Sequence, residues 1–415
     1  MILVRLALFA AATTFAAQQP APRAMPPAAP VTPAGSIRIS VITLGQGDAV
    51  FERFGHNALR VQDPVAGTDV AYNWGMFSFD EPGFLRRFLR GDTRYWVEAI
   101  PTPWLLDHYA RGDRRTEEQV LALTPEQAAR VASLAAVYAR EENKFYRYDY
   151  FLDNCSTRVR DILDVVLGGA LERRFAAIRT PWTYRSEAVR LTEPSPWAQV
   201  GGDIALGPRA DIPMTAWESM FIPMRLRDHL RDVTVPGADG RPIPLVMEER
   251  VLYEARRAPE ATERRGLVLG AWGPILAVWM LLLTPWSALT RRRTRVPAAV
   301  MAALWYGATG VLGIALAGMW VGSAHVFWYD NLNLLLLSPI GVVAAIPVAG
   351  AILRGQLTRL GRLLLVVMIG QVALALLIAP YVAQSLGGPL LLFAPAHLGL
   401  ALAAWRHTRV TAAVR

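Results

Sequence analysis

The strongest constraint on this chain is a set of long uncharged stretches in its carboxyl-terminal third. A helix needs about 20 apolar residues to cross the roughly 30 Å hydrocarbon core of a bilayer. The uncharged run at 363–405 is too long for one helix, and the turn-forming residues SLGGP at 385–389 divide it. The sequence therefore predicts an all-α polytopic membrane domain of about five helices, with spans near 266–286, 297–319, 332–353, 363–384 and 389–405.

Arginines beside the predicted spans indicate their orientation, because loops on the cytoplasmic side carry an excess of lysine and arginine. Four arginines just before the first span favour the opposite orientation, but three glutamates accompany them. We therefore expect a bacterial inner-membrane protein with its large amino-terminal part in the periplasm and a cytoplasmic tail. The segments rich in arginine are 291–295, 354–362 and 406–415, and the loops without lysine or arginine are 320–331 and 385–389.

The amino-terminal part starts with two segments that are not expected to join its fold. Residues 1–17 combine one early arginine, an apolar run and small residues, as in a signal peptide or an uncleaved anchor. Residues 18–36 are rich in proline and alanine without periodicity, which is typical of a tether. A soluble domain is expected over 37–252, and a linker over 253–265 connects it to the membrane.

The charge distribution disfavours nucleic acid as a partner. The net charge of +9 is almost entirely arginine, because Lys144 is the only lysine, and many arginines flank apolar segments. The first half of the chain shows no basic stripe with interleaved aromatic residues. The charge therefore indicates a membrane surface.

The soluble domain is expected to mix strands and helices. Residues 37–44 alternate as in a strand, with Ile37, Ile39 and Val41 on one face, and HNALRV, DVAYNWG and RYWVEAI predict further strands. GFLRRFLRG and TPWLLDHYARG predict short helices ended by glycine, and 124–140 predicts a longer helix that a threonine caps. Residues 170–230 predict mostly amphipathic helix, and VTVPGADGRPIPLV predicts a hairpin.

The only cysteine, Cys155, is predicted to lie at the start of a helix. One cysteine excludes an intramolecular disulfide and disfavours a structural thiolate metal site. Asp153 or Asn154 can cap the helix CSTRVRDILDVVL, and the dipole and free N–H groups of its first turn would stabilise a thiolate or an oxyanion. The alternative is that Cys155 is a small buried apolar side chain.

A nucleophilic thiol needs a base and a group that orients the base. Of the six histidines, His56 opens a predicted strand, and the next strand supplies Asn73, an amide that could hold the ring in one tautomer. His108 and His229 are expected to be solvated. His56 could instead serve only the structure.

Three pieces of the sequence carry a family resemblance: FGHNALRV, YNWGMFSFDEPGFLRRFLRGDTRYWV and YRYDYFLDNCSTRVRDIL. Over about 37–200 they closely resemble the amino-terminal periplasmic domain of Lnb-type proteins. The resemblance implies an α+β domain of the permuted papain-like, NlpC/P60-like kind. It also implies Cys155 as nucleophile and His56 as base, with Asn73 as the third member.

A second resemblance lies in the membrane half. SAHVFWYDNLNLLLLSP, at 323–339, is similar to the histidine, NxN pair and apolar run of Lnb-type proteins with a membrane portion. The predicted topology places Asp330 at the outer membrane face together with His325, Asn331 and Asn333, and the last three could serve substrate binding. Alternatively, the two asparagines cap the third span, and Trp328 and Tyr329 belong to the interfacial aromatic belt.

The family resemblance implies a role in the N-acylation of bacterial lipoproteins. Cys155 would take an acyl chain from a membrane phospholipid as a thioester, and the amino-terminal amine of a lipoprotein would accept it, with no cofactor and no metal. A periplasmic amidase or peptidase acting on cell-wall peptides is an alternative enzyme, although five spans exceed what such a hydrolase needs. A membrane-anchored sensor or scaffold is the non-enzymatic alternative, in which Cys155→Ser would leave the phenotype intact.

Overall fold

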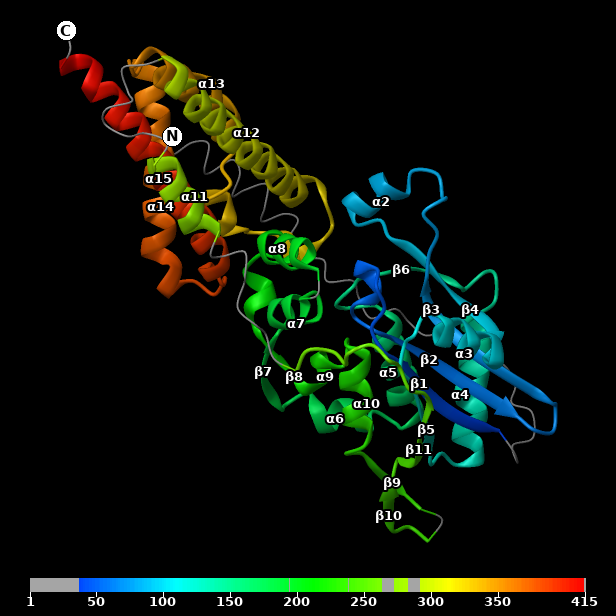
Figure 1. The fold of residues 1–415 in the computed structure, drawn as a ribbon. Helices are drawn as coiled ribbons and strands as arrows, with labels where there is room; N and C mark the ends of the chain where they lie inside the picture. Colours follow the sequence, from blue (N-terminus) through cyan, green and yellow to red (C-terminus); the bar gives the residue numbers. More distant parts are fainter. Residues whose placement is uncertain (1–36, 194, 238, 263–271, 283–291, 414–415) are drawn as a thin grey trace.

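The computed structural model describes residues 37–193, 195–237, 239–262, 272–282 and 292–413. The predicted signal segment at 1–17 and tether at 18–36 lie outside the described residues, as does part of the first predicted span. Figure 1 shows an elongated molecule, with a β-sheet at one end and long carboxyl-terminal helices at the other.

Within the described part of the chain, seven strands form one antiparallel sheet. The predicted strands at 37–44, HNALRV, DVAYNWG and RYWVEAI are confirmed, and the strands that carry His56 and Asn73 are neighbours in this sheet. In spatial order the strands are β11 (Val246–Tyr253), β5 (Thr116–Leu121), β1 (Arg38–Leu44), β2 (His56–Asp63), β3 (Thr68–Met76), β4 (Arg94–Pro101) and β6 (Phe145–Arg147).

Helices cover both faces of the sheet. On one face, α4 (Pro125–Tyr138) and α5 (Cys155–Val166) pack on Ile39 and Val41 of β1, as the alternation of that strand predicts. On the other face, α3 (Thr102–Arg111) contributes Leu105 to a smaller apolar cluster. Burial on both sides holds the middle strands rigidly, and this rigidity benefits any side chain that projects from their ends.

Sequence reasoning missed strand β5, whose sequence TEEQVL lacks the apolar alternation of a strand. The strand is nonetheless fully buried, because ion pairs accompany its acidic residues into the interior. Glu118 pairs with Arg60 at 2.8 Å, and Glu117 pairs with Arg115 at 3.0 Å and with Arg227. Burying a charge is costly unless it is paired, so the acidic residues of β5 can be buried because these arginines neutralise them.

The region at 170–230 is mostly helical, as predicted, but a small ribbon interrupts it. Strand β7 (Arg179–Thr183) pairs with β8 (Pro213–Thr215), and the predicted hairpin forms between β9 (Thr234–Pro236) and β10 (Pro242–Pro244). The helices are α6 (Ala170–Phe175), α7 (Tyr184–Leu191), α8 (Pro196–Ala205), α9 (Ala216–Ser219) and α10 (Pro223–Leu230), and the shorter helix α2 (Phe84–Arg90) follows β3.

Three described segments are long and apolar enough to cross a membrane: Arg295–Gly322, Val326–Arg354 and Arg359–Tyr381. The segment Gly387–Leu402 is a shorter apolar helix, so the count of five spans stays a prediction. The helices of this region are α11 (Trp272–Leu282), α12 (Arg292–Gly322), α13 (Ile340–Arg354), α14 (Arg359–Ile378) and α15 (Gly387–Ala413).

The third predicted span, 332–353, differs in its first part. Regular α-helix begins only at Ile340, and two 3₁₀ turns precede it, η4 (Val326–Trp328) and η5 (Leu332–Leu335). Asn331 caps η5, since its side chain accepts a hydrogen bond from the Asn333 N–H at 3.0 Å. The residues predicted to open a membrane helix thus form a turn.

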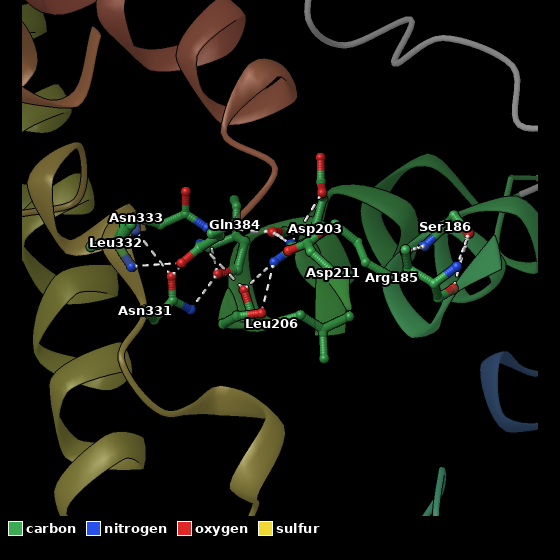
Figure 2. A network of polar contacts seen from close by, with 12 residues as sticks. Arg185, Ser186, Asp203, Leu206, Asp211, Asn331, Leu332, Asn333 and Gln384 are labelled. Atoms are coloured by element: carbon green, nitrogen blue, oxygen red, sulfur yellow. Dashed lines mark hydrogen bonds and ion pairs between the residues drawn. The ribbon is translucent and has the colours of Figure 1, made fainter. Parts of the chain in front are cut away.

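That turn joins the membrane helices to the soluble domain (Figure 2). Helix α8 ends at Ala205, and the last carbonyls of a helix lack partners within it. Asn331 donates to the carbonyls of Ile204 at 2.8 Å and Ala205 at 2.9 Å, and Asn333 donates to Ile204 at 2.9 Å. The interdomain joint, as we call it, consists of Arg185, Asp203, Asp211, Asn331, Asn333 and Gln384.

Candidate functional site

Three segments far apart in the sequence meet at the sulfur of Cys155. Cys155 is the first residue of α5, His56 is the first residue of β2, and Asn73 lies in β3. Helix α5 packs on both strands, and the thiol and the His56 ring are hydrogen-bonded. The Nε2 atom of the ring contacts Oδ1 of Asn73. The structure thus brings together all three residues predicted to form the centre.

The surroundings of Cys155 favour its thiolate. The residue is only 7% exposed, and burial alone would raise the thiol pKa. The positive charge of His56 and its hydrogen bond, together with the backbone N–H groups of Asn57 and Ser156, outweigh burial and lower the pKa of Cys155 below its ordinary 9.0. These neighbours favour a reactive thiol over a plain apolar side chain.

Asn73 sets the tautomer of His56. The amide oxygen of Asn73 can only accept, so the Nε2 atom bears the proton and Nδ1 is left to face the sulfur. Burial would lower the pKa of His56, but the charge and hydrogen bond of Cys155 and the bond to Asn73 raise it above 6.5. The ring is therefore poised to take the thiol proton and to keep it.

We expect the thiolate of Cys155 to form below pH 9.0, the ordinary midpoint for a thiol. Since the pKa of His56 is raised, the imidazolium persists above pH 6.5, and the two shifts together favour the Cys155–His56 ion pair. In His56→Ala the positive charge beside Cys155 is lost while the thiol stays buried, so the pKa of Cys155 should rise. The rate of alkylation by iodoacetamide across pH measures it, with the exposed His108→Ala as control. A wild-type midpoint at or above 9.0 would contradict the ion pair.

Sequence reasoning did not find the residues that hold the outer side of His56. Tyr109 of α3 stacks on the imidazole, with ring centroids 6.2 Å apart and 7° between the planes. Arg114 lies over the Tyr109 ring at 4.5 Å and pairs with Glu52 at 3.1 Å. Burial raises the pKa of Tyr109 to about 12, so its hydroxyl stays neutral beside the ion pair. Its segment predicts only a short helix, and nothing in that pattern indicates a contact with β2.

The start of α5 settles which residue is the cap. Asn154 accepts hydrogen bonds from the N–H groups of Ser156 at 2.9 Å and Thr157 at 3.0 Å. Its amide also donates to the carbonyls of Tyr150 and Phe221 at 3.0 and 2.9 Å. Asp153 instead pairs with Arg158, and burial raises its pKa despite that pairing. Both side chains position the helix, through the cap of its first turn and the ion pair with Arg158.

Gly75 keeps space open beside the sulfur. It has φ +91, and a Cβ placed on it would lie 3.4 Å from the Tyr148 ring and 3.8 Å from Cβ of Cys155. A bulge between Trp74 and Met76 interrupts the pairing of β3 with β4 at this point. The positive φ would strain any other residue here, and its Cβ would occupy the space between Tyr148 and Cys155. The glycine lies beside the site, and sequence reasoning did not single it out.

The predicted accessory residues in the membrane half lie in the contact between domains. His325 is buried, donates from Nε2 to the carbonyl of Phe88 at 2.7 Å, and lies beside the rings of Tyr150 and Trp328. Burial lowers its pKa, and neither Cys155 nor His56 contributes to that shift. Asn331 and Asn333 bind α8 in the interdomain joint. A role of these three residues in substrate binding stays a prediction.

Within the described residues, no three His, Cys, Asp or Glu side chains form a group that could hold a metal ion. The chemistry available at the centre is that of a thiol, an imidazole and an amide.

Comparison with known protein families matches both halves of the chain. A model of the Lnb N-terminal periplasmic domain matches residues 31–188, which include Cys155, His56 and Asn73. A model of the Lnb transmembrane domain matches residues 269–406. Neither the curated proteins nor the solved structures contain a match.

Proposed function

This chain belongs to the Lnb family, and we propose that it is a membrane-bound thiol acyltransferase that N-acylates bacterial lipoproteins. The observation that carries the proposal is the direct contact of Cys155, His56 and Asn73 in one buried centre. A nucleophile, a base and a group that orients the base are the requirements for covalent acyl transfer. The membrane half supports a lipid substrate, because it anchors the domain that carries the centre to a bilayer.

The proposal includes a particular fold and topology. The domain would be a permuted papain-like, NlpC/P60-like fold, in which the histidine strand precedes the cysteine helix along the chain. Five spans would anchor it in the inner membrane, with the centre in the periplasm and the carboxyl terminus in the cytoplasm. The arginine distribution supports this orientation.

In the first step the Cys155 thiolate attacks the ester carbonyl carbon of a phospholipid. A C–S bond forms, the carbonyl electrons move to oxygen, and the C–O bond of the ester then breaks. His56, holding the proton it took from the thiol, gives that proton to the departing alkoxide. The products are an acyl thioester on Cys155, a lysophospholipid and a neutral His56.

The first turn of α5 supports the oxyanion of this step. The cap Asn154 occupies the N–H groups of Ser156 and Thr157. Within the part of the chain that the structure describes, this leaves the N–H of Cys155 as the donor of the first turn for the developing negative charge. The positive end of the helix dipole acts in the same direction.

In the second step the amino-terminal amine of a diacylglyceryl-modified lipoprotein cysteine attacks the thioester. His56 takes a proton from the amine as the C–N bond forms, and the C–S bond breaks to return the thiolate. Water would give a free fatty acid instead. A buried centre beside a bilayer limits water and favours the amine.

The proposal is tested by complementation in bacteria depleted of their own lipoprotein N-acyltransferase. Mass spectrometry of lipoprotein amino termini should show triacyl forms with the wild-type protein and diacyl forms with Cys155→Ala or His56→Ala. His108→Ala is the matched control and should behave as the wild type, because His108 is exposed, stacks on Trp104 and meets the Tyr109 ring edge-on. Diacyl forms that persist with well-expressed wild-type protein would overturn the transferase assignment, and trimmed cell-wall peptides would then favour the amidase.

A further inference from the structure

An open pocket of about 520 Å³ lies between helix α2 of the soluble domain and the carboxyl-terminal end of membrane helix α12. One wall is formed by α2, and the other by the last turns of α12. We call it the α2–α12 groove, and the residues that line it are Leu85, Arg86, Leu89, Arg90, Gly318, Met319 and Gly322.

The two walls of the α2–α12 groove are held in place by the chain that follows α12. The N–H of Ala324 donates to the carbonyl of Arg90 at 2.9 Å, and Arg147 donates to the carbonyl of Ala324 at 3.2 Å. His325 binds the carbonyl of Phe88. At Gly91, which has φ +72, a Cβ would lie 3.1 Å from the backbone of Ala324. The groove is therefore pre-formed, which lowers the cost of binding.

The groove combines an apolar surface with two positive charges. Leu85 is 67% exposed and Leu89 is 43% exposed, although both are large apolar side chains. Arg86 and Arg90 are exposed beside them, and no ion pair to either occurs in the described residues, whereas the adjacent Arg87 pairs with Glu81. Apolar side chains interleaved with unpaired arginines at the end of a membrane helix complement an acyl chain next to an anionic group.

From these observations we propose that the α2–α12 groove binds a membrane phospholipid. Arg86 and Arg90 hold its phosphate, and an acyl chain lies along Leu89, Gly318 and Met319. The inference of a lipid site comes from the groove itself. Its assignment as the entry site of the acyl donor rests on the proposed function.

The inner face of α2 connects the groove to the catalytic centre through stacked rings. Phe84 stacks on Phe77 at 5.8 Å, Phe77 on Tyr95 at 4.9 Å, and Tyr95 on Tyr148 at 4.4 Å. Tyr148 borders the space beside Cys155. This continuous stack of rings packs α2 against the sheet and fixes the position of the groove relative to the catalytic centre.

Photolabelling tests the site with the full chain in vesicles of phosphatidylethanolamine that carries a photoactivatable acyl chain. We expect labelled peptides from α2 and from the last turns of α12. Arg86→Ala/Arg90→Ala should reduce labelling about tenfold, as expected for two arginines beside a phosphate. The matched control is Arg130→Ala/Arg140→Ala, which removes the same charge from exposed positions on and just after α4, away from the membrane helices (Figure 1). Equal labelling of the two variants would overturn the proposal.

A second variant keeps the charges and fills the groove. A Cβ on Gly318 meets nothing within 4 Å, so Gly318→Phe can extend into the groove without displacing backbone, and it should also reduce labelling. Cys155→Ala should be labelled as the wild type, since binding precedes chemistry. If labelling follows the groove variants while no thioester forms on Cys155, the site stands and the transferase fails. If the groove variants transfer acyl chains at the wild-type rate, the assignment of the groove as the entry site fails and the transferase stands.

Discussion

Cys155→Ala should reduce acyl transfer by about 10⁶-fold, and adding His56→Ala to it should reduce the rate no further. Residues that act as one unit have strongly non-additive effects, and removal of a nucleophile abolishes the whole covalent route. His56→Ala alone should cost about 10²- to 10⁴-fold, the usual contribution of a general acid–base. The His56→Ala variant loses both the charge that lowers the pKa of Cys155 and the proton donor for the leaving group.

Single-turnover transfer from a phospholipid to an acceptor amine by the purified full chain measures these effects, with the N-acylated product detected by mass spectrometry. His108→Ala is the control for loss of a histidine outside the centre. A double variant much slower than Cys155→Ala would mean that His56 acts without the sulfur. Wild-type rates in Cys155→Ala would dismiss the covalent mechanism and leave the domain with a binding role.

The centre was predictable because two of its residues open elements with strong local signals and the third lies in a neighbouring strand. Cys155 follows a helix cap, His56 opens an alternating strand, and Asn73 lies in the next strand of the same hairpin. Local patterns cannot show what packs on these residues from elsewhere. Tyr109 reaches His56 only because α3 lies on the sheet, and that arrangement depends on tertiary contacts rather than on its own periodicity.

Two further differences from the sequence expectations share one cause, which is the pairing of polar groups between distant segments. Strand β5 has acidic residues where a strand would have apolar ones, and arginines from other elements compensate them. The start of the third predicted span departs from helix because Asn331 and Asn333 bind α8. A hydropathy pattern registers that segment as apolar and cannot indicate its polar partners.

Arg185→Ala should lower the free energy of unfolding by about 3–5 kcal/mol, the usual cost of removing one partner from a buried ion pair. Arg185 is 0% exposed and forms ion pairs with Asp203 at 3.2 Å and Asp211 at 2.9 Å. It also donates to the carbonyls of Leu206 at 2.6 Å and Gly207 at 3.2 Å, just beyond the end of α8. Arg185→Lys should restore little, because an ammonium cannot make this set of bonds.

Urea denaturation in detergent measures the stability, and hydrogen exchange locates the damage. Arg60→Ala is the matched control, since Arg60 forms ion pairs with Asp69 and Glu118 inside the sheet. The rate of amide hydrogen exchange at residues 326–335 should rise in Arg185→Ala and stay unchanged in Arg60→Ala. Equal exchange there in the two variants would mean that Arg185 stabilises only its own domain.

The position of the interdomain joint gives this stability effect a catalytic consequence. Arg185 and Asn331 both bind the end of α8, from the soluble side and from the membrane side (Figure 2). A loosened interdomain joint should let the Cys155 centre move away from the bilayer without altering the contact between Cys155 and His56. Asn331→Ala/Asn333→Ala should therefore acylate Cys155 normally from a water-soluble acyl ester and slowly from a phospholipid in vesicles. Equal losses with both donors would show that the joint shapes the centre itself rather than its distance from the membrane.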